Sequence, residues 1–179
     1  MLSQTLLISA LFGVSYASVA FPRGQCGETA QKVCFGQNGG ESQHVDLEDV
    51  KYVADVLRYI SDNNQGAAKF WNMLKAIGDC AEWSLPVTDA GTVLALAKHI
   101  SPRTNSSILY EDLARAIDGG ASATPEEAKN SLYGCGTNGG MMGVTANLSN
   151  PLYNTPEYKN SGAKPEGIII KIVRAPAKK

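Results

Sequence analysis

Two histidines could act as bases in this chain, His44 and His99. A hydrolytic nucleophile needs a base beside it, so any Ser-His or Cys-His system would have to use one of them. We predict that His99 lies in the last turn of a helix, where the helix dipole favours a cation, and that His44 is exposed in a polar stretch before another helix. A ribonuclease would also need an arginine nearby, from among Arg23, Arg58, Arg103 and Arg115. The spacing of these residues does not bring them together, so a small hydrolase is an alternative hypothesis.

Glu82 beside Trp83 is the second group that could do chemistry. Paired carboxylates hydrolyse glycosidic bonds, and an aromatic ring can stack on a sugar. The competing interpretation is structural: Trp83 and Trp71 fill the core, and Glu82 alternates outward on a strand. A glycosidase is therefore the other form of the hydrolase hypothesis, and we assign no catalytic residue.

The cysteines form an even set that predicts two disulfides: Cys26, Cys34, Cys80 and Cys135. Three connectivities are possible. Long loops restrict the unfolded chain most, so we favour Cys26 and Cys34 each pairing with one of Cys80 and Cys135. Fully paired cysteines leave no thiol nucleophile. The chain has no CxxC motif and its histidines are isolated, so we expect neither zinc nor any other cofactor.

A glycine-rich segment contains the last cysteine, Cys135, and has the sequence GCGTNGGMM at 134–142. Papain-like proteases have a comparable segment, but this chain lacks their CGSCW-like nucleophile motif. The segment also does not lie between a strand and a helix, as a phosphate cradle would. We interpret it as a loop or hairpin anchored by a disulfide.

Two sequons, at Asn105 and Asn147, fit N-glycosylation. Pro102 and its polar neighbours suggest a surface loop, so we expect Asn105 to be the better acceptor.

The first twenty residues read as a cleaved secretory signal. They carry no charged side chain, the stretch 6–14 is largely apolar, and small residues stand at Ser18 and Ala20. The apolar run is too short to span a bilayer, and no stop-transfer segment follows. We therefore expect a mature chain of residues 21–179, exported to the extracellular space, where disulfides persist.

The length and composition of the chain suit one domain with a hydrophobic core. Hydrophobic residues make up 44% of the chain and the formal net charge is −1, which argues against a general nucleic-acid binder. Charge is unevenly spread, because residues 41–62 are acidic and residues 159–179 basic. We expect no membrane span, no nucleic-acid partner and a monomer.

The residues around Asp46 have the pattern of a helix N-terminus. Asp46 can cap it, with Glu48 and Asp49 near the positive end of the dipole. Its apolar face would be Val50, Val53, Ala54, Leu57 and Ile60. Further helices are expected at 67–74, from Thr88 to about residue 100, at 109–117, and after Thr124, where Pro125 and Glu127 complete a capping box.

Short strands are expected at 31–36, 76–85, 144–148 and 167–174, where isoleucine and valine favour a sheet. Residues 150–166 would be a long polar loop. These elements predict an α+β two-layer sandwich with helices on one face of a mainly antiparallel sheet, stapled by disulfides.

One block resembles a known family. WNMLKAIGDCA, at 71–81, resembles the W-x-x-L…G-x-C-A segment of secreted fungal necrosis-inducing effectors, whose type member comes from the tomato leaf-mould fungus. YEDLARAI, at 110–117, resembles that family's helix before its last cysteine, which would be Cys135 here, and the helix at 50–60 looks like its first helix. The family has a cysteine at the start of that helix, whereas this chain has Val50 and Lys51, with Cys34 earlier.

The resemblance implies a secreted, non-enzymatic effector with the α/β sandwich fold of smut-virus killer toxins. Such a protein binds a target, protein or glycan, in a host plant or competing microbe, and causes cell death or alters immunity. The family supplies no catalytic residues to carry over. Besides the hydrolase, a secreted carbohydrate- or protein-binding inhibitor is a third hypothesis, and would expose Trp83 or several tyrosines as a flat patch.

Overall fold

The structure is a computed structural model that describes residues 26–75 and 80–177. The predicted signal peptide, residues 1–20, and Arg23 lie outside the described residues. The helices are α1 (Leu47–Asn63), α2 (Tyr110–Asp118), α3 (Pro125–Asn130) and α4 (Pro156–Asn160), with 3₁₀ helices η1 (Gly66–Lys69), η2 (Leu132–Asn138) and η3 (Pro151–Asn154). The strands are β1 (Val33–Cys34), β2 (Phe70–Met73), β3 (Glu82–Ser84), β4 (Val93–His99), β5 (Ser106–Leu109), β6 (Gly140–Gly143) and β7 (Ile168–Arg174).

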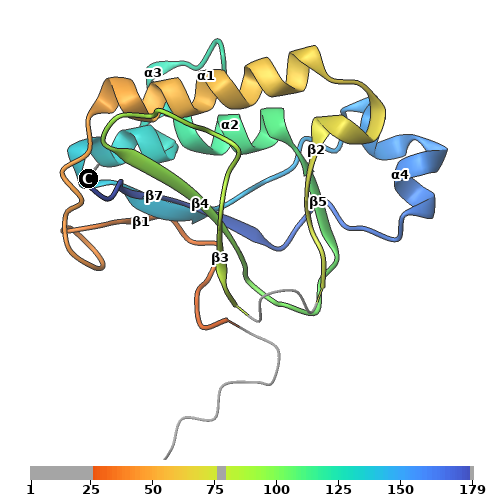
Figure 1. Ribbon diagram of the computed structural model, residues 1–179, viewed down its shortest axis with the longest axis horizontal. Coiled ribbons are helices and arrows are strands. Elements are labelled where there is room, and N and C mark those ends of the chain that lie inside the picture. The colour runs from red at the N-terminus through yellow and green to blue at the C-terminus, as the bar shows by residue number, and fades with distance from the viewer. Residues whose placement is uncertain (1–25, 76–79, 178–179) are drawn as a thin grey trace, which may run out of the picture.

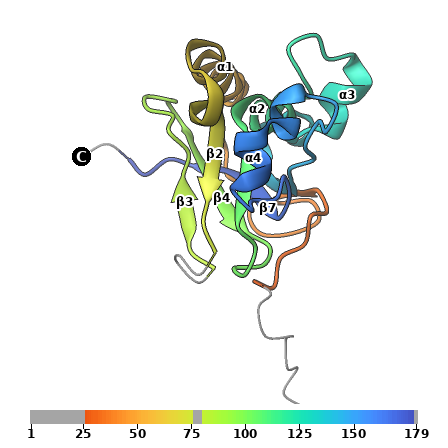
Figure 2. The same cartoon turned by 90° about the vertical axis from the view of Figure 1, so that its right-hand side faces the viewer.

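The fold is the predicted α+β sandwich. A five-stranded sheet has the order β1-β6-β7-β4-β3, β2 and β5 form a separate ribbon, and all of these strand pairs are antiparallel. Helices α1 and α2 lie side by side on one face of the sheet (Figure 1; Figure 2). The core between the layers includes Val53, Leu57, Ala95, Leu113, Ile117, Ile170 and Ile172.

The opposite face of the sheet is crossed by the start of the described chain. Cys26 N donates to the carbonyl of Ile100, and Gly143 N donates to that of Ala30. The segment is held by the Cys26–Cys80 disulfide, while Cys34–Cys135 joins β1 to η2. Both long-loop pairings agree with the predicted preference. No helix of the described residues is long and apolar enough to cross a bilayer.

The capped helices form as predicted. Asp46 caps α1 by accepting from Glu48 N. Thr124 and Glu127 make both bonds of the capping box at α3. Gly119 ends α2 in the left-handed region, with φ of 96°, where a Cβ would also collide with the backbone of residue 127.

The predicted helix from Thr88 to about residue 100 is wrong, because the stretch forms β4. Val93, Ala95 and Ala97 face the helices, while Leu94 and Leu96 lie on the other, partly covered face. Apolar residues on both faces of a strand match helical spacing as readily as strand spacing. His99 consequently lies at the end of a strand.

The predicted helix at 67–74 is also wrong, since η1 is followed by β2, which pairs with β5. The sheet does not include a strand at 144–148, because the pairing with β7 uses β6 instead. The loop at 150–166 contains η3 and α4, each begun by a capping residue before proline, Asn150-Pro151 and Thr155-Pro156. In the predicted strand at 76–85, residues 82–84 form β3, and residues 76–79 lie outside the described part.

Candidate functional site

The two histidines lie at opposite ends of the β4–β7 pair. His99 is opposite Ile168 at the start of β7, and Arg174 at the end of β7 donates from Nη1 to the carbonyl of His44 at 2.8 Å. Because β7 has seven residues at about 3.3 Å each, the histidines lie on the order of 20 Å apart. His99 is 1% exposed, and its Nε2 lies 3.3 Å from the carbonyl of Leu74. The two histidines therefore do not share a pocket.

Glu82 points outward on β3, as predicted, but into an ion-pair cluster. Lys171 binds both Glu82 and Glu28, and Lys98 Nζ lies 2.6 Å from Glu28. Trp83 packs against the core on the other face. Burial would raise the pKa of Glu28, but its hydrogen bonds to Lys171 and Lys98 outweigh burial and lower that pKa. The cluster clamps the segment after Cys26 onto the sheet.

The ion pairs of Glu28 predict that the free energy of unfolding decreases at acidic pH. The pKa of Glu28 is lower in the folded protein than its ordinary value of 4.5. The ionised Glu28 carboxylate therefore stabilises the fold at pH values above 4.5, and this stabilisation is lost as the pH falls through the pKa of the folded state. Glu28→Gln should therefore flatten the decline in free energy of unfolding between about pH 5 and pH 3. Urea titrations at several pH values measure this slope.

The matched control is Glu166→Gln, because the Glu166 side chain is 67% exposed and its contact with Lys164 is 3.9 Å long. Such surface pairs contribute little, so this variant should follow the wild-type slope. If Glu28→Gln and Glu166→Gln gave the same slope, the clamp would not govern acid stability.

A buried carboxylate at the start of α2 holds the 150–166 segment. Asp112 is 2% exposed, and its Oδ2 accepts from the Tyr153 hydroxyl at 2.6 Å and from Asn147 N at 3.2 Å. The same hydroxyl accepts from Leu109 N at 2.9 Å, and Arg115 pairs with Asp112. Burial first, and then the Asp112 carboxylate, raise the pKa of Tyr153. Sequence reasoning missed this network because Asp112 has the pattern of an ordinary acidic residue in a first helical turn.

Aromatic rings fasten the same segment to the β2–β5 ribbon. Tyr158 stacks on Phe70 with ring centroids 5.0 Å apart, and Tyr153 meets both rings edge-on. The Tyr158 hydroxyl donates to the carbonyl of Ser107 at 2.8 Å, and burial raises its pKa to about 12. The segment containing η3 and α4 is thereby fixed beside β2 and β5 (Figure 2).

A cavity of about 310 Å³ lies between this segment and the ribbon. Its apolar lining is Ala67, Phe70, Leu74, Leu152, Tyr158 and Ala163. Its polar lining includes Asn72, Asn105, Ser107, Thr155, Glu157 and Ser161. Preformed pockets with apolar walls and a few polar groups are typical of small-ligand sites, so this cavity is the candidate functional site.

The polar groups of the cavity differ in whether their hydrogen bonds are satisfied. Ser107 Oγ donates to Asn72 Oδ1 at 2.6 Å. Asn105 Oδ1 is buried and accepts no hydrogen bond from the described residues. Less than 1 Å² of this oxygen is accessible, so a donor group placed in the cavity does not reach it.

The solvent exposure of the two sequons favours Asn147, whereas the sequence alone favoured Asn105 as the better acceptor. Asn105 is half-buried, and the sequon hydroxyl of Ser107 is 4% exposed. Asn147 is exposed. Glycosylation of either residue stays a prediction, with Asn147 the more accessible acceptor.

The remaining arginines are dispersed over the described surface. Arg58 of α1 makes a bidentate pair of hydrogen bonds with Asp118 of α2, from Nη1 to Oδ2 at 2.7 Å and from Nη2 to Oδ1 at 2.6 Å. Arg115 pairs with Asp112, and Arg103 is exposed. Among the described residues, no group of three or more His, Cys, Asp or Glu side chains could hold a metal ion.

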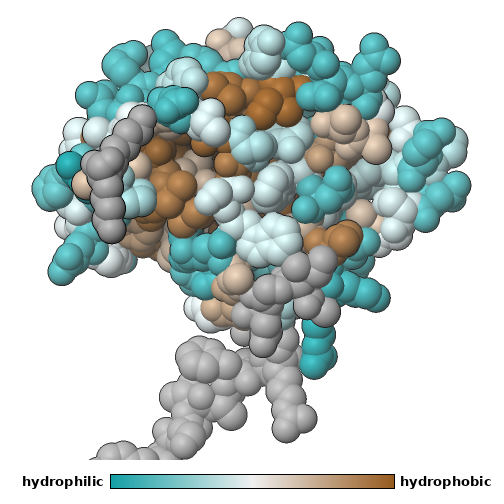
Figure 3. All heavy atoms as spheres, viewed as in Figure 1, coloured by the Kyte–Doolittle hydropathy of each residue, from teal (hydrophilic) through white to brown (hydrophobic). Residues whose placement is uncertain are grey.

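Exposed aromatic residues bear on the inhibitor hypothesis. Trp83 is half-buried against the core, so it does not form a flat exposed patch. Tyr52 and Tyr59 are 43% and 68% exposed and lie two turns apart on one face of α1. Figure 3 shows hydrophobic side chains in separate patches within a largely hydrophilic surface on the face seen there.

The segments that carry the family resemblance now have places in the fold. Residues 50–60 lie in α1, residues 110–117 in α2 and residues 71–73 in β2, and Cys135 is bonded to Cys34. The chain matches no family model, no curated protein and no solved structure. Membership of the effector family is therefore a proposal that rests on these segments alone.

Proposed function

We propose that this protein is a secreted effector or killer-toxin-like protein that acts by binding a host or competitor molecule through the cavity beside Phe70 and Tyr158. The observation that carries the proposal is the cavity itself, which has apolar walls and a polar lining made mostly of amide and hydroxyl side chains. The disulfides agree with an oxidising compartment, and the signal-like residues 1–20 and the family resemblance favour export.

Binding accounts for the cavity better than hydrolysis does. General acid–base catalysis needs titratable groups within hydrogen-bond reach of one substrate. In the cavity lining, Glu157 is exposed and the Tyr158 hydroxyl is already bonded to the carbonyl of Ser107. The other polar lining groups are amides and hydroxyls, which orient ligands through hydrogen bonds.

The proposal predicts that filling the cavity abolishes activity outside the cell. Ala67 lines the cavity, so Ala67→Phe should block it and reduce activity at least about ten-fold, the effect of losing about 1.4 kcal/mol of binding free energy. The readout is cell death or altered immune response after infiltration of purified protein into plant leaves, together with growth inhibition of competing fungi and bacteria.

Ala68→Phe is the matched control. Ala68 is the next residue of η1, is also exposed and does not line the cavity, so this variant should keep wild-type activity. Thermal unfolding must show that both variants fold. A folded Ala67→Phe variant with full activity, or a wild-type protein with no effect on any host or competitor, would overturn the proposal.

A further inference from the structure

Helix α1 has a second apolar stripe, on the side turned away from the core. Its inner stripe, which includes Val53 and Leu57, is buried between α1, α2 and the sheet. On the outer side, Tyr52 is 43% exposed, Tyr59 is 68% exposed and Val56 is half-buried. Figure 1 shows α1 along the upper edge of the molecule, with α2 and the sheet beneath it. Surface helices usually turn polar side chains outward, and tyrosine is enriched in protein interfaces, so this stripe has the composition of a docking surface.

The spacing of the stripe is that of a coiled-coil seam. Tyr52, Val56, Tyr59 and Asn63 follow one another at intervals of four, three and four residues, and we call them the outer seam. This alternation corresponds to d and a positions of successive heptads, which face a second helix. At 3.6 residues per turn, the four positions lie within about 60° of one another around the helix axis. A second helix could therefore lie along the whole outer seam.

A row of carboxylates runs beside the outer seam. Glu48, Asp55 and Asp62 repeat every seven residues, all three are exposed, and we call them the acidic row. They occupy the g positions of the same heptads, and charges at e and g positions determine which helices pair. Three like charges in one row favour a partner helix with lysine or arginine at the facing positions, and they disfavour a second copy of α1.

The cations near the acidic row do not neutralise it. Arg58, whose side chain is 12% exposed, is shared by the carboxylates of Asp55, Glu111 and Asp118. An open groove of about 420 Å³ beside Tyr52 has four carboxylates and one lysine in its lining. These are Glu48, Asp49, Asp55 and Asp89, with Lys51. The outer face of α1 is therefore negatively charged around an exposed apolar seam.

We propose that the outer face of α1 binds a basic amphipathic helix of a partner protein. The apolar side chains of that helix would pack on the outer seam, and its lysines or arginines would face the acidic row, which is the helix-to-helix form of recognition by apolar anchors at heptad spacing. None of the outer-seam residues lines the cavity beside Phe70 and Tyr158. This inference therefore concerns a second surface and does not depend on the proposed function.

The test uses the purified, disulfide-bonded protein and three synthetic peptides, each three heptads long. The basic peptide has leucine at a and d and lysine at e and g, and the acidic peptide has glutamate in place of lysine. The third peptide has the composition of the basic one in an order without heptads. Fluorescence anisotropy measures the three affinities. The basic heptad peptide should bind at least about ten-fold more tightly than either of the others, because only it matches both the seam and the charge.

A tyrosine variant connects this binding to the outer seam. Tyr52→Ala combined with Tyr59→Ala should weaken binding of the basic peptide at least about ten-fold, because tyrosines within an interface often carry much of its binding energy. The matched control is Leu148→Ala, since Leu148 is 61% exposed and lies between β6 and η3, outside α1. This variant should bind as the wild type does. Both changes are at exposed positions, so both variants should fold, which circular dichroism and thermal unfolding verify.

A charge-reversal variant tests the acidic row. Asp55→Lys combined with Asp62→Lys should invert the preference, so that the acidic heptad peptide binds more tightly than the basic one. A merely structural role of these residues would not produce an inversion.

Four results would overturn the proposal. They are no binding of the basic heptad peptide, equal binding of the peptide without heptads, an unchanged preference in the charge-reversal variant, and equal losses in the tyrosine variant and in Leu148→Ala. Concentration-dependent dimerisation in sedimentation experiments that the tyrosine variant abolishes would instead identify a second copy of this chain as the occupant.

Discussion

Replacing both Cys34 and Cys135 by serine is expected to lower the free energy of unfolding by about 4–5 kcal/mol. The bond joins residues separated by 101 positions, so its loss restores the entropy of a long loop to the unfolded chain. In a protein of this length, the melting temperature should fall by roughly 8–20 °C. Thermal unfolding followed by circular dichroism, with and without reductant, measures the change.

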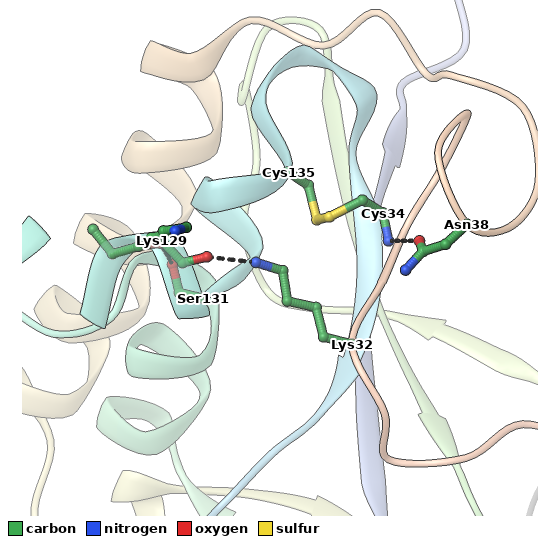
Figure 4. The surroundings of a disulfide bond; sticks show 7 residues. Lys32, Cys34, Asn38, Lys129, Ser131 and Cys135 are labelled. Carbon is green, nitrogen blue, oxygen red and sulfur yellow. Dashed lines mark hydrogen bonds between the residues drawn. A yellow bond between two sulfur atoms is a disulfide. The ribbon is translucent and has the colours of Figure 1, made fainter. Parts of the chain in front are cut away.

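The native surroundings of this bond add to the expected loss. Cys135 is 1% exposed and Cys34 8% exposed, so serine hydroxyls at these positions would be buried. Figure 4 shows Asn38 Oδ1 accepting from Cys34 N at 2.7 Å, while Lys32 Nζ donates to the carbonyl of Lys129 at 2.7 Å. Together with the disulfide, these bonds hold the short edge strand β1 against β6.

The control is the Cys26→Ser, Cys80→Ser double variant. That bond spans 54 positions, and loop-closure entropy alone gives it a similar value of about 4 kcal/mol. Cys26 and Cys80 are only half-buried, so the serines at these positions keep contact with water. The Cys34, Cys135 variant should therefore unfold at the lower temperature, and the reverse order would contradict this account.

Local signals made parts of the fold predictable from the sequence. Asp46, Thr124 and Glu127 determine helix starts through bonds to neighbouring backbone, so α1 and α3 could be placed without knowing what they pack against. The isoleucine run of β7 likewise indicated a strand. Loop entropy disfavoured a Cys26–Cys34 bond from chain positions alone, but it left open which of Cys80 and Cys135 each of them joins, and the fold decides that choice.

The sequence-based predictions that were wrong concern elements whose structure depends on tertiary contacts. β4 has apolar residues on both faces because helices cover one face and the segment after Cys26 covers part of the other, which a single sequence does not reveal. The cavity was missed for the same reason. The pairing of β2 with β5 brings the strand of Phe70 beside the segment of Asn105, and the Asp112–Tyr153 hydrogen bond holds the segment of Tyr158 beside them. Both contacts join residues that are far apart in the sequence.

Asp112→Ala is expected to lower the free energy of unfolding by about 3–5 kcal/mol, because removing one member of a buried ionic network leaves its partners unpaired. The Tyr153 hydroxyl and Asn147 N would lose their acceptor, and Arg115 its partner. Urea denaturation measures the loss. The control is Asp55→Ala, whose side chain is 61% exposed and 3.7 Å from Arg58, and which should stay within about 0.5 kcal/mol of wild type.

Tyr153→Phe separates the stability of the segment from that of the whole protein. It keeps the ring against Phe70 and Tyr158 but removes the hydroxyl that joins Leu109 N to Asp112, at an expected cost of about 1–3 kcal/mol. Hydrogen exchange should then accelerate in residues 150–166 before it does in α1, because the lost hydroxyl anchors this segment, which forms one wall of the cavity. Exchange that quickened equally in both regions would mean that the hydroxyl supports the core as a whole and not the cavity wall.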